Sequence, residues 1–346
     1  MKLHIRQMLK TQGRHLSFHT PGHKRAGEDI TELSYSDNLL SPSGVIALAE
    51  GDCARILGAN RSYFLTDGST CGIFSMLYAL KEAGCRRIAV PTASHRSVGN
   101  ACAVLGLTPV PVTQEIRAGI PAQPTAAAIT EALAGADALL LTSPDYYGYF
   151  APLEEAKLLC KEAGKPLVVD GAHGGHLHGT PAHAGNYADM WVDGVHKSLP
   201  ALTQGAVVSA KTENWAEHLG HGVRIFRTTS PSYPILASVE HAVKYPQNPK
   251  IEALSEQFKH EIGALANNDW TKIVVPFGAL ATEAQHALEA RGVYPEFNDG
   301  NYLMFYLSPC TRAGDLKRLK RILKGLPRDM VGENVAEGRI LIYSEN

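Results

Sequence analysis

Short apolar runs alternate with helix-like segments along the first two thirds of the chain. The runs suit buried strands, and they span residues 63–65, 88–90, 109–112, 139–141, 167–169 and 206–208. Segments such as 72–81 and 153–160 have helical character and lie between runs. Strands that alternate with helices are typical of a mostly parallel sheet with helices on both faces. The pattern therefore predicts a large α/β domain.

Polar segments directly follow several of these runs. Ligands of parallel sheets bind beyond the carboxyl ends of the strands, so residues at those ends are candidates for function. The segments span residues 66–70, 92–95, 142–147 and 170–173.

The pattern changes near residue 232. Helices are predicted from about 233, over 251–266, over 280–291 and over the basic segment 316–324, with strands at 273–275 and 302–307. This arrangement predicts a smaller α+β domain. We expect an arm over 1–45, a large domain over 46–245 and a small domain over 246–346. The Ala-rich stretch 125–138 is expected to be helix.

Composition excludes several classes of protein. Hydrophobic residues make up 45% and charged residues 19%, which is ordinary for a globular protein. The formal net charge of −1 gives no reason to expect nucleic acid or an acidic membrane as a partner. No apolar run reaches bilayer-spanning length. Six cysteines without a CxxC pair suit reduced thiols in the cytoplasm.

The first forty residues are expected to be irregular. They contain the stretch Phe18–Arg25, FHTPGHKR, in which Pro21-Gly22 predicts a turn, and His15 lies just before it. On physical grounds alone this stretch is an ordered N-terminal arm.

Asp170 and Lys197 carry the strongest chemical signal. Asp170 ends the apolar run Leu167–Val169, and Lys197 lies between two apolar segments. An acid and a lysine in this order suit a pyridoxal phosphate (PLP) enzyme, because the lysine holds the cofactor as a Schiff base and the acid keeps the pyridine nitrogen protonated. Partial burial would lower the pKa of the lysine, as this chemistry requires.

The segment Asp67–Gly72, DGSTCG, lies between a predicted strand and a predicted helix. Small residues there let backbone N–H groups approach a phosphate, and the helix N-terminus favours the anion. A helix N-cap explains the same Ser and Thr residues equally well. The segment is neither a GxSxG elbow nor a P-loop.

Four histidines lie close together at His173, His176, His178 and His183. A zinc hydrolase is the alternative that they raise. The spacing matches no common zinc motif, so we expect no metal site and interpret the histidines as groups that line a loop.

Seven motifs together resemble one family. In chain order they are Phe18–Lys24, Gly68–Thr70, Ser94–Ser97, Ser143–Gly148, Asp170–Gly174, Val195–Lys197 with Thr203-Gln204, and Thr228–Tyr233. The chain resembles the ornithine/lysine/arginine decarboxylases, which are fold type I PLP enzymes related to aspartate aminotransferase. Their fold implies a mostly parallel seven-stranded sheet with a smaller α+β domain.

The resemblance also implies roles for individual residues. Lys197 would hold PLP, Asp170 would pair with its ring nitrogen, and His95 and Ala172 would lie against the two faces of its ring. Lys197 or His95 would then donate the proton to Cα, which makes Lys197, Asp170 and His95 the expected catalytic residues. The remaining expected cofactor contacts are Ser69, Thr70, Cys71, His173 and His196, with Ser230 reaching the site of the partner subunit in a homodimer. The arm would lie at that interface.

The implied reaction is decarboxylation of lysine, arginine or ornithine, in polyamine or acid-stress metabolism. Glu296 and Asp299 are candidates for selecting a basic substrate. A PLP enzyme with another reaction, such as an aldolase or lyase, and a catalytically weak PLP-fold regulatory protein stay as alternatives.

The chain departs from the family pattern in two ways. Family members usually carry a polar side chain where this chain has Gly171 and Gly194. They also continue into a further C-terminal domain, so we expect a short form.

Overall fold

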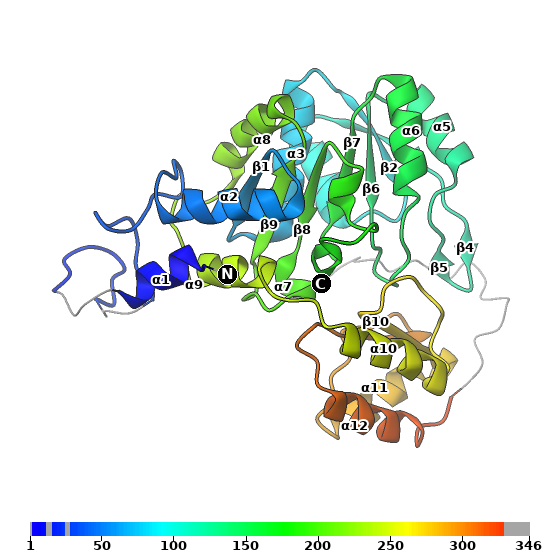
Figure 1. The fold of residues 1–346 in the computed structure, drawn as a ribbon. Helices are drawn as coiled ribbons and strands as arrows, with labels where there is room; N and C mark the ends of the chain where they lie inside the picture. Colours follow the sequence, from blue (N-terminus) through cyan, green and yellow to red (C-terminus); the bar gives the residue numbers. More distant parts are fainter. Residues whose placement is uncertain (1, 12–15, 25–27, 329–346) are drawn as a thin grey trace.

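A seven-stranded sheet forms the centre of the larger part of the molecule (Figure 1). The computed structural model describes residues 2–11, 16–24 and 28–328. In spatial order the strands are β1 (Arg61–Leu65), β9 (Ala206–Ala210), β8 (Met190–Asp193), β7 (Leu167–Gly171), β6 (Ala138–Thr142), β2 (Arg87–Pro91) and β3 (Thr108–Val112). β9 is antiparallel to both of its neighbours, and the other pairings are parallel. The predicted mostly parallel sheet is confirmed.

Helices cover both faces of this sheet (Figure 1). Side chains alternate along each strand, so Phe64 joins one hydrophobic core and Leu65 the other. The first core includes α1 (His4–Lys10), α2 (Val45–Leu57), α5 (Ala126–Ala134), α6 (Leu153–Ala163) and α9 (Tyr233–Val243). The second includes α3 (Gly68–Glu82), α4 (Arg96–Leu105) and α8 (Glu213–Phe226).

A smaller α+β unit follows, with its own core. Its antiparallel sheet has the order β10 (Lys272–Pro276), β12 (Tyr302–Tyr306) and β11 (Phe297–Asn298). The helices α10 (Pro249–Ile262), α11 (Ala281–Glu289) and α12 (Ala313–Leu323) belong to it. Figure 1 shows this unit beside one edge of the large domain. The predicted small domain of mixed type is confirmed.

Short elements complete the chain. They are the β4 (Ile116–Arg117) and β5 (Ile120–Pro121) hairpin, the helix α7 (Val195–Ser198), and the 3₁₀ turns η1 (Gly175–Leu177), η2 (Ala184–Asn186) and η3 (Gly278–Leu280). Ile120 packs with Tyr147 and Tyr302 in a separate small cluster. This cluster fixes the loop after β6 against the small sheet.

Three sequence-based predictions differ from the structure. The N-terminal segment is not wholly irregular, because α1 buries Ile5 and Leu9 and the N–H groups of His4 and Ile5 donate to Glu240. The Ala-rich stretch is not one helix, since α5 ends at Ala134 and β6 begins at Ala138. The segment Met190–Asp193 forms the strand β8, which is not among the strands predicted from the sequence. His15 and Arg25 lie outside the described residues.

No helix in the described part of the chain is both long and apolar enough to cross a bilayer.

Candidate active site

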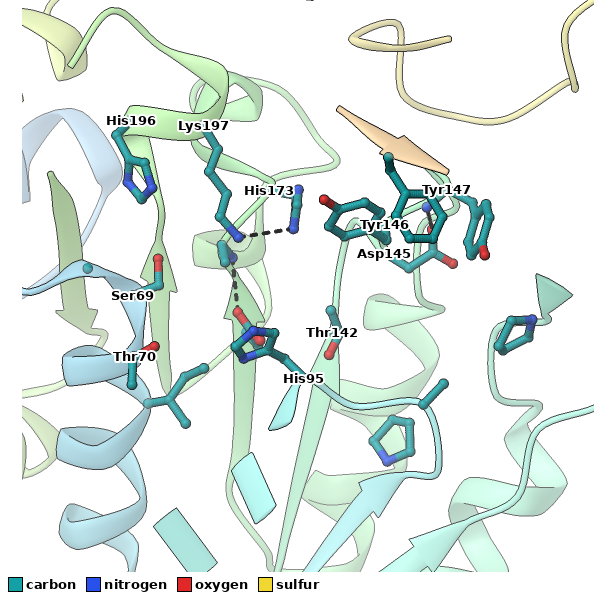
Figure 2. Close-up of a pocket in the computed structure, with 18 of the residues that line it drawn as sticks. Ser69, Thr70, His95, Thr142, Asp145, Tyr146, Tyr147, His173, His196 and Lys197 are labelled. Carbon is teal, nitrogen blue, oxygen red and sulfur yellow. Dashed lines mark hydrogen bonds between the residues drawn. The ribbon is translucent and has the colours of Figure 1, made fainter. Parts of the chain in front are cut away.

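A cavity of about 380 Å³ opens at the carboxyl ends of the parallel strands. It brings together most of the residues that the sequence analysis singled out: Ser69, Thr70, His95, Asp170, Ala172, His173, His196 and Lys197. Figure 2 shows Lys197 and His173 pointing toward each other above His95, with Ser69 and Thr70 on one side. These residues come from α3, the N-terminus of α4, the end of β7 and α7.

Lys197 lies on α7, directly after β8. Its Nζ is 3.2 Å from Nε2 of His173. Burial lowers the pKa of Lys197, and the negative charge of Asp170 opposes that shift. A lysine with a lowered pKa has more of its unprotonated, nucleophilic form at neutral pH.

Asp170 occupies the end of β7 and is buried. Its Oδ1 accepts a hydrogen bond of 3.1 Å from the N–H of Ala172. Burial raises the pKa of Asp170, while the charge of Lys197 and this backbone hydrogen bond lower it. Among the residues that the structure describes, no side chain donates a hydrogen bond to this carboxylate. Its other oxygen is therefore available to a protonated atom of a ligand.

His95 is the N-cap residue of α4. Its Nδ1 accepts from the N–H of Ser97 at 3.2 Å and lies 2.7 Å from the Ser97 hydroxyl. These contacts fix the plane of the ring in the cavity (Figure 2). Burial lowers the pKa of His95, so the ring is neutral near pH 7.

Ser69 and Thr70 lie in the first turn of α3, and Asp67 is the N-cap residue. Neither hydroxyl is therefore the N-cap of this helix. The first turn holds no acidic residue, and the buried Ser69 hydroxyl has no hydrogen-bond partner. An unpaired buried hydroxyl beside a helix N-terminus fits an anionic ligand group such as phosphate.

The loop before β9 closes this side of the cavity. The carbonyl of Gln204 accepts a hydrogen bond of 2.9 Å from the N–H of Gly68. Nδ1 of His196 lies 2.8 Å from the carbonyl of Gly205. Thr203 and Gln204 both line the cavity.

Two tyrosines form the opposite wall, and each is tied to one of the predicted acidic residues. The Tyr146 hydroxyl donates to Glu296 at 3.1 Å, and the Tyr147 hydroxyl donates to Asp299 at 2.8 Å. Glu296 and Asp299 themselves are exposed, whereas both tyrosines line the cavity. The acidic pair therefore lies behind an aromatic wall.

Two predicted residues are not brought to the cavity. Cys71 is on α3 but packs into the hydrophobic core. Ser230 is exposed in the loop before α9. Its predicted role concerns the partner subunit, which a single chain does not test.

The histidine cluster is divided among separate partners. His176 pairs with Asp269 at 2.9 Å and His183 with Asp193 at 3.2 Å, while His178 contacts the carbonyl of Gly175. Among the residues that the structure describes, no group of three or more His, Cys, Asp or Glu side chains is arranged to hold a metal ion.

Gln114 and Gln123 also line the cavity, and sequence reasoning missed both. Gln114 follows the carboxyl end of β3, so the rule applied to the other strands would have found it. Gln123 donates to Asp145 at 2.8 Å. Burial raises the pKa of Asp145 to about 6.

The two glycines that depart from the family pattern are in close packing. A Cβ added to Gly171 would lie 2.9 Å from the carbonyl oxygen of Val192. One added to Gly194 would lie 2.8 Å from Oγ of Ser69. Side chains at these positions require the neighbouring backbone to move.

Solved structures share this fold. The constitutive lysine decarboxylase of E. coli superposes with a TM-score of 0.75 at 20% identity, covering 92% of this chain and 59% of that one. A serine palmitoyltransferase structure described as carrying a PLP internal aldimine gives a TM-score of 0.65 at 14% identity, over 80% of this chain and 74% of that one. The fold is therefore that of the fold type I PLP enzymes.

Sequence comparison is more specific. Residues 21–265 match the family described as Orn/Lys/Arg decarboxylase, major domain, and the chain belongs to this family. The uncharacterized protein YaaO of Bacillus subtilis is 30% identical over 342 residues, covering 84% of this chain and 70% of YaaO. The arginine decarboxylase of Halalkalibacterium halodurans is 33% identical over 258 residues. That match covers 66% of this chain and 52% of the enzyme, so the chain spans about half of that relative's length.

Proposed function

We propose that this protein is a PLP-dependent decarboxylase of a basic amino acid, namely arginine, lysine or ornithine. One observation carries the proposal: Lys197, Asp170 and His95 line one cavity, in a chain of the Orn/Lys/Arg decarboxylase family. Several relatives are named arginine decarboxylases, which favours arginine among the three.

The residues of the cavity fit PLP. The unpaired Ser69 hydroxyl, with Thr70 and the α3 N-terminus, suits the phosphate. The amine of Lys197 suits the aldehyde, and the carboxylate of Asp170 suits the protonated ring nitrogen. His95 and Ala172 supply the surfaces against the ring. Bound PLP would accept the electrons of the bond that breaks when carbon dioxide leaves.

The protein's own groups have three tasks in this reaction. Asp170 holds a negative charge in a buried place, where its attraction to a cation is strong. The partly desolvated Lys197 amine acts as nucleophile and then as a proton donor to the product carbon. The aromatic wall of Tyr146 and Tyr147 excludes water from its side of the cavity.

Glu296 and Asp299 would select the substrate. Both carboxylates lie beside tyrosines of the cavity wall, so they give that wall a negative potential. The positively charged end of a basic amino acid is attracted to such a wall, whereas a neutral side chain is not.

We further propose a cytoplasmic homodimer, with the arm over residues 1–45 at the interface and Ser230 at the partner's cofactor. The domain division at residues 45 and 245 belongs to the same proposal. Sedimentation of the wild-type protein tests the dimer, and a monomer at micromolar concentration would contradict it.

A substrate screen tests the reaction. The PLP-loaded protein is given carboxyl-labelled arginine, lysine, ornithine, serine and alanine, and released carbon dioxide is counted. We expect release from at least one basic amino acid and not from the neutral ones. No release from any basic amino acid would instead support a different PLP reaction.

A further inference from the structure

A series of buried polar contacts leads from Lys197 into the small domain. Beyond the 3.2 Å contact between Lys197 and His173, Nδ1 of His173 lies 3.3 Å from the hydroxyl of Tyr306. The two rings stack, with their centroids 5.9 Å apart and their planes 24° from parallel. Tyr306 ends β12, so a residue of the small domain holds the ring that contacts Lys197.

Tyr306 is itself held by a buried ion pair. Nζ of Lys272 lies 3.7 Å from the centre of the Tyr306 ring, within cation–π range. Lys272 also pairs with Asp269 at 3.2 Å, and both side chains are fully buried. Buried charges of this kind are costly to separate, so the position of Lys272 over the ring is fixed.

The carboxylate of Asp269 is fixed in turn. Its Oδ1 accepts hydrogen bonds from the N–H and the hydroxyl of Thr271 at 2.9 and 2.7 Å, and it lies 2.9 Å from Nε2 of His176. Several donors therefore converge on one acid. These contacts hold Asp269 in place, and Asp269 in turn holds Lys272 against the ring of Tyr306.

The contacts determine which nitrogen of His173 carries the proton. Burial and the charges of Lys197 and Lys272 lower the pKa of His173, so its ring is neutral. A neutral imidazole has one donor nitrogen and one acceptor nitrogen. A protonated lysine only donates, so Nε2 of His173 accepts from it. Nδ1–H then donates to the Tyr306 hydroxyl.

We propose that His173 and Tyr306 form a tether that orients the amine of Lys197 and stabilises its protonated form. Tyr306 does not touch the amine and acts as a positioning residue through His173. The inference rests on the proposed role of Lys197 as the cofactor-binding lysine. It adds that a residue of the small domain influences the orientation and the protonation of that lysine.

Other groups around Lys197 also influence its charge, and a substitution of Tyr306 leaves these groups in place. The charges of Asp170 and Glu296 raise its pKa. The remaining titratable groups that share its electrostatic surroundings are His95, His196 and Lys272. Tyr146 packs edge-on against His173 with the ring centroids 5.0 Å apart.

The experiment measures the pKa of Lys197 in the PLP-free protein. The rate of acylation of Lys197 is followed against pH by peptide mass spectrometry in the wild type and in Tyr306→Phe. We expect the pKa of Lys197 to fall by about 0.5–1 unit in the variant, the effect of about one hydrogen bond. An unchanged pKa in a folded variant would overturn the proposal.

Tyr302→Phe is the matched control. Tyr302 is a buried tyrosine of the same strand, and its hydroxyl donates to the carbonyl of Ala118 at 2.9 Å. Its loss should leave the pKa of Lys197 at the wild-type value. An equal shift in both variants would mean that the effect is general to the strand, and the tether would be rejected.

A second measurement reads the tautomer in the wild type, and the variant His173→Gln serves only to assign the signal. Nitrogen-15 NMR of labelled histidine in the wild type reports the tautomer of His173, assigned by comparison with His173→Gln. We expect the neutral ring with the proton on Nδ1. A proton on Nε2 would overturn the tether. Both measurements use PLP-free protein, so they are independent of whether the protein decarboxylates anything.

Discussion

Gly194 and the carbonyl oxygen of Ala172 are so close that no side chain fits between them. A Cβ added to Gly194 would lie 2.4 Å from that oxygen, in the segment that joins β8 to Lys197. A side chain at this position, which the family pattern leads us to expect, therefore requires a different backbone. In this chain the glycine allows α7 to approach the end of β7.

Gly194→Ser should destabilise the protein by about 1–3 kcal/mol, because overpacking displaces backbone that has no free space. Urea unfolding measures the change. Gly99→Ala is the control: Gly99 lies in α4, and a Cβ there meets nothing within 4 Å. Its effect should be neutral or slightly stabilising. A Gly194→Ser protein as stable as the wild type would refute the packing argument.

Asp170→Asn should lower the rate of carbon dioxide release by at least about 100-fold, because it removes the buried charge while keeping an oxygen for the Ala172 N–H. Steady-state assays of the PLP-loaded protein measure the rate. The control is Asp189→Asn at the amino end of β7, where the carboxylate accepts a hydrogen bond from the N–H of Leu167. If both variants lose activity equally, the charge of Asp170 has no special part in the reaction.

Stability should depend on pH through Asp145. Its pKa is raised from 3.8 to about 6 in the folded protein. The folded state therefore binds the proton more tightly, and the contribution to stability is present at low pH and lost as the pH rises through about 6. Asp145→Asn should remove this loss, with a relative gain of up to about 3 kcal/mol between pH 4 and pH 7.5.

Urea unfolding of both proteins across this range measures the difference in slope. The substitution keeps an oxygen for the N–H groups of Tyr147 and Tyr149, which donate to Oδ1 at 2.9 Å. Parallel stability curves for the two proteins would show that Asp145 is not the titrating group.

Glu296→Gln should raise KM for a basic substrate by about tenfold with a smaller effect on kcat, since it removes a charge near the cavity wall and influences Lys197 only at a distance, less than Asp170 does. Glu283→Gln, on the exposed side of α11, is the control. A fall in kcat with an unchanged KM would place Glu296 in the chemistry instead of in substrate selection.

The sequence predicted the cavity residues of the large domain better than it predicted the small-domain residues that contact them. Asp170 and Ser69 were found because each follows an apolar strand, and the topology then places the strand ends together. Cys71 was expected in the site but faces the core, because consecutive helical residues point in different directions. Lys272 and Tyr306 were not found, since they reach His173 only through the tertiary packing of the two domains.

The most direct test of the central claim is to locate PLP on the chain. The PLP-loaded protein is reduced with borohydride, digested, and its peptides are examined by mass spectrometry, with Lys161→Ala and Lys197→Ala in parallel. We predict a pyridoxyl group on Lys197 in the wild type and in Lys161→Ala, and none in Lys197→Ala. A pyridoxyl group on another lysine, or on none, would contradict the account.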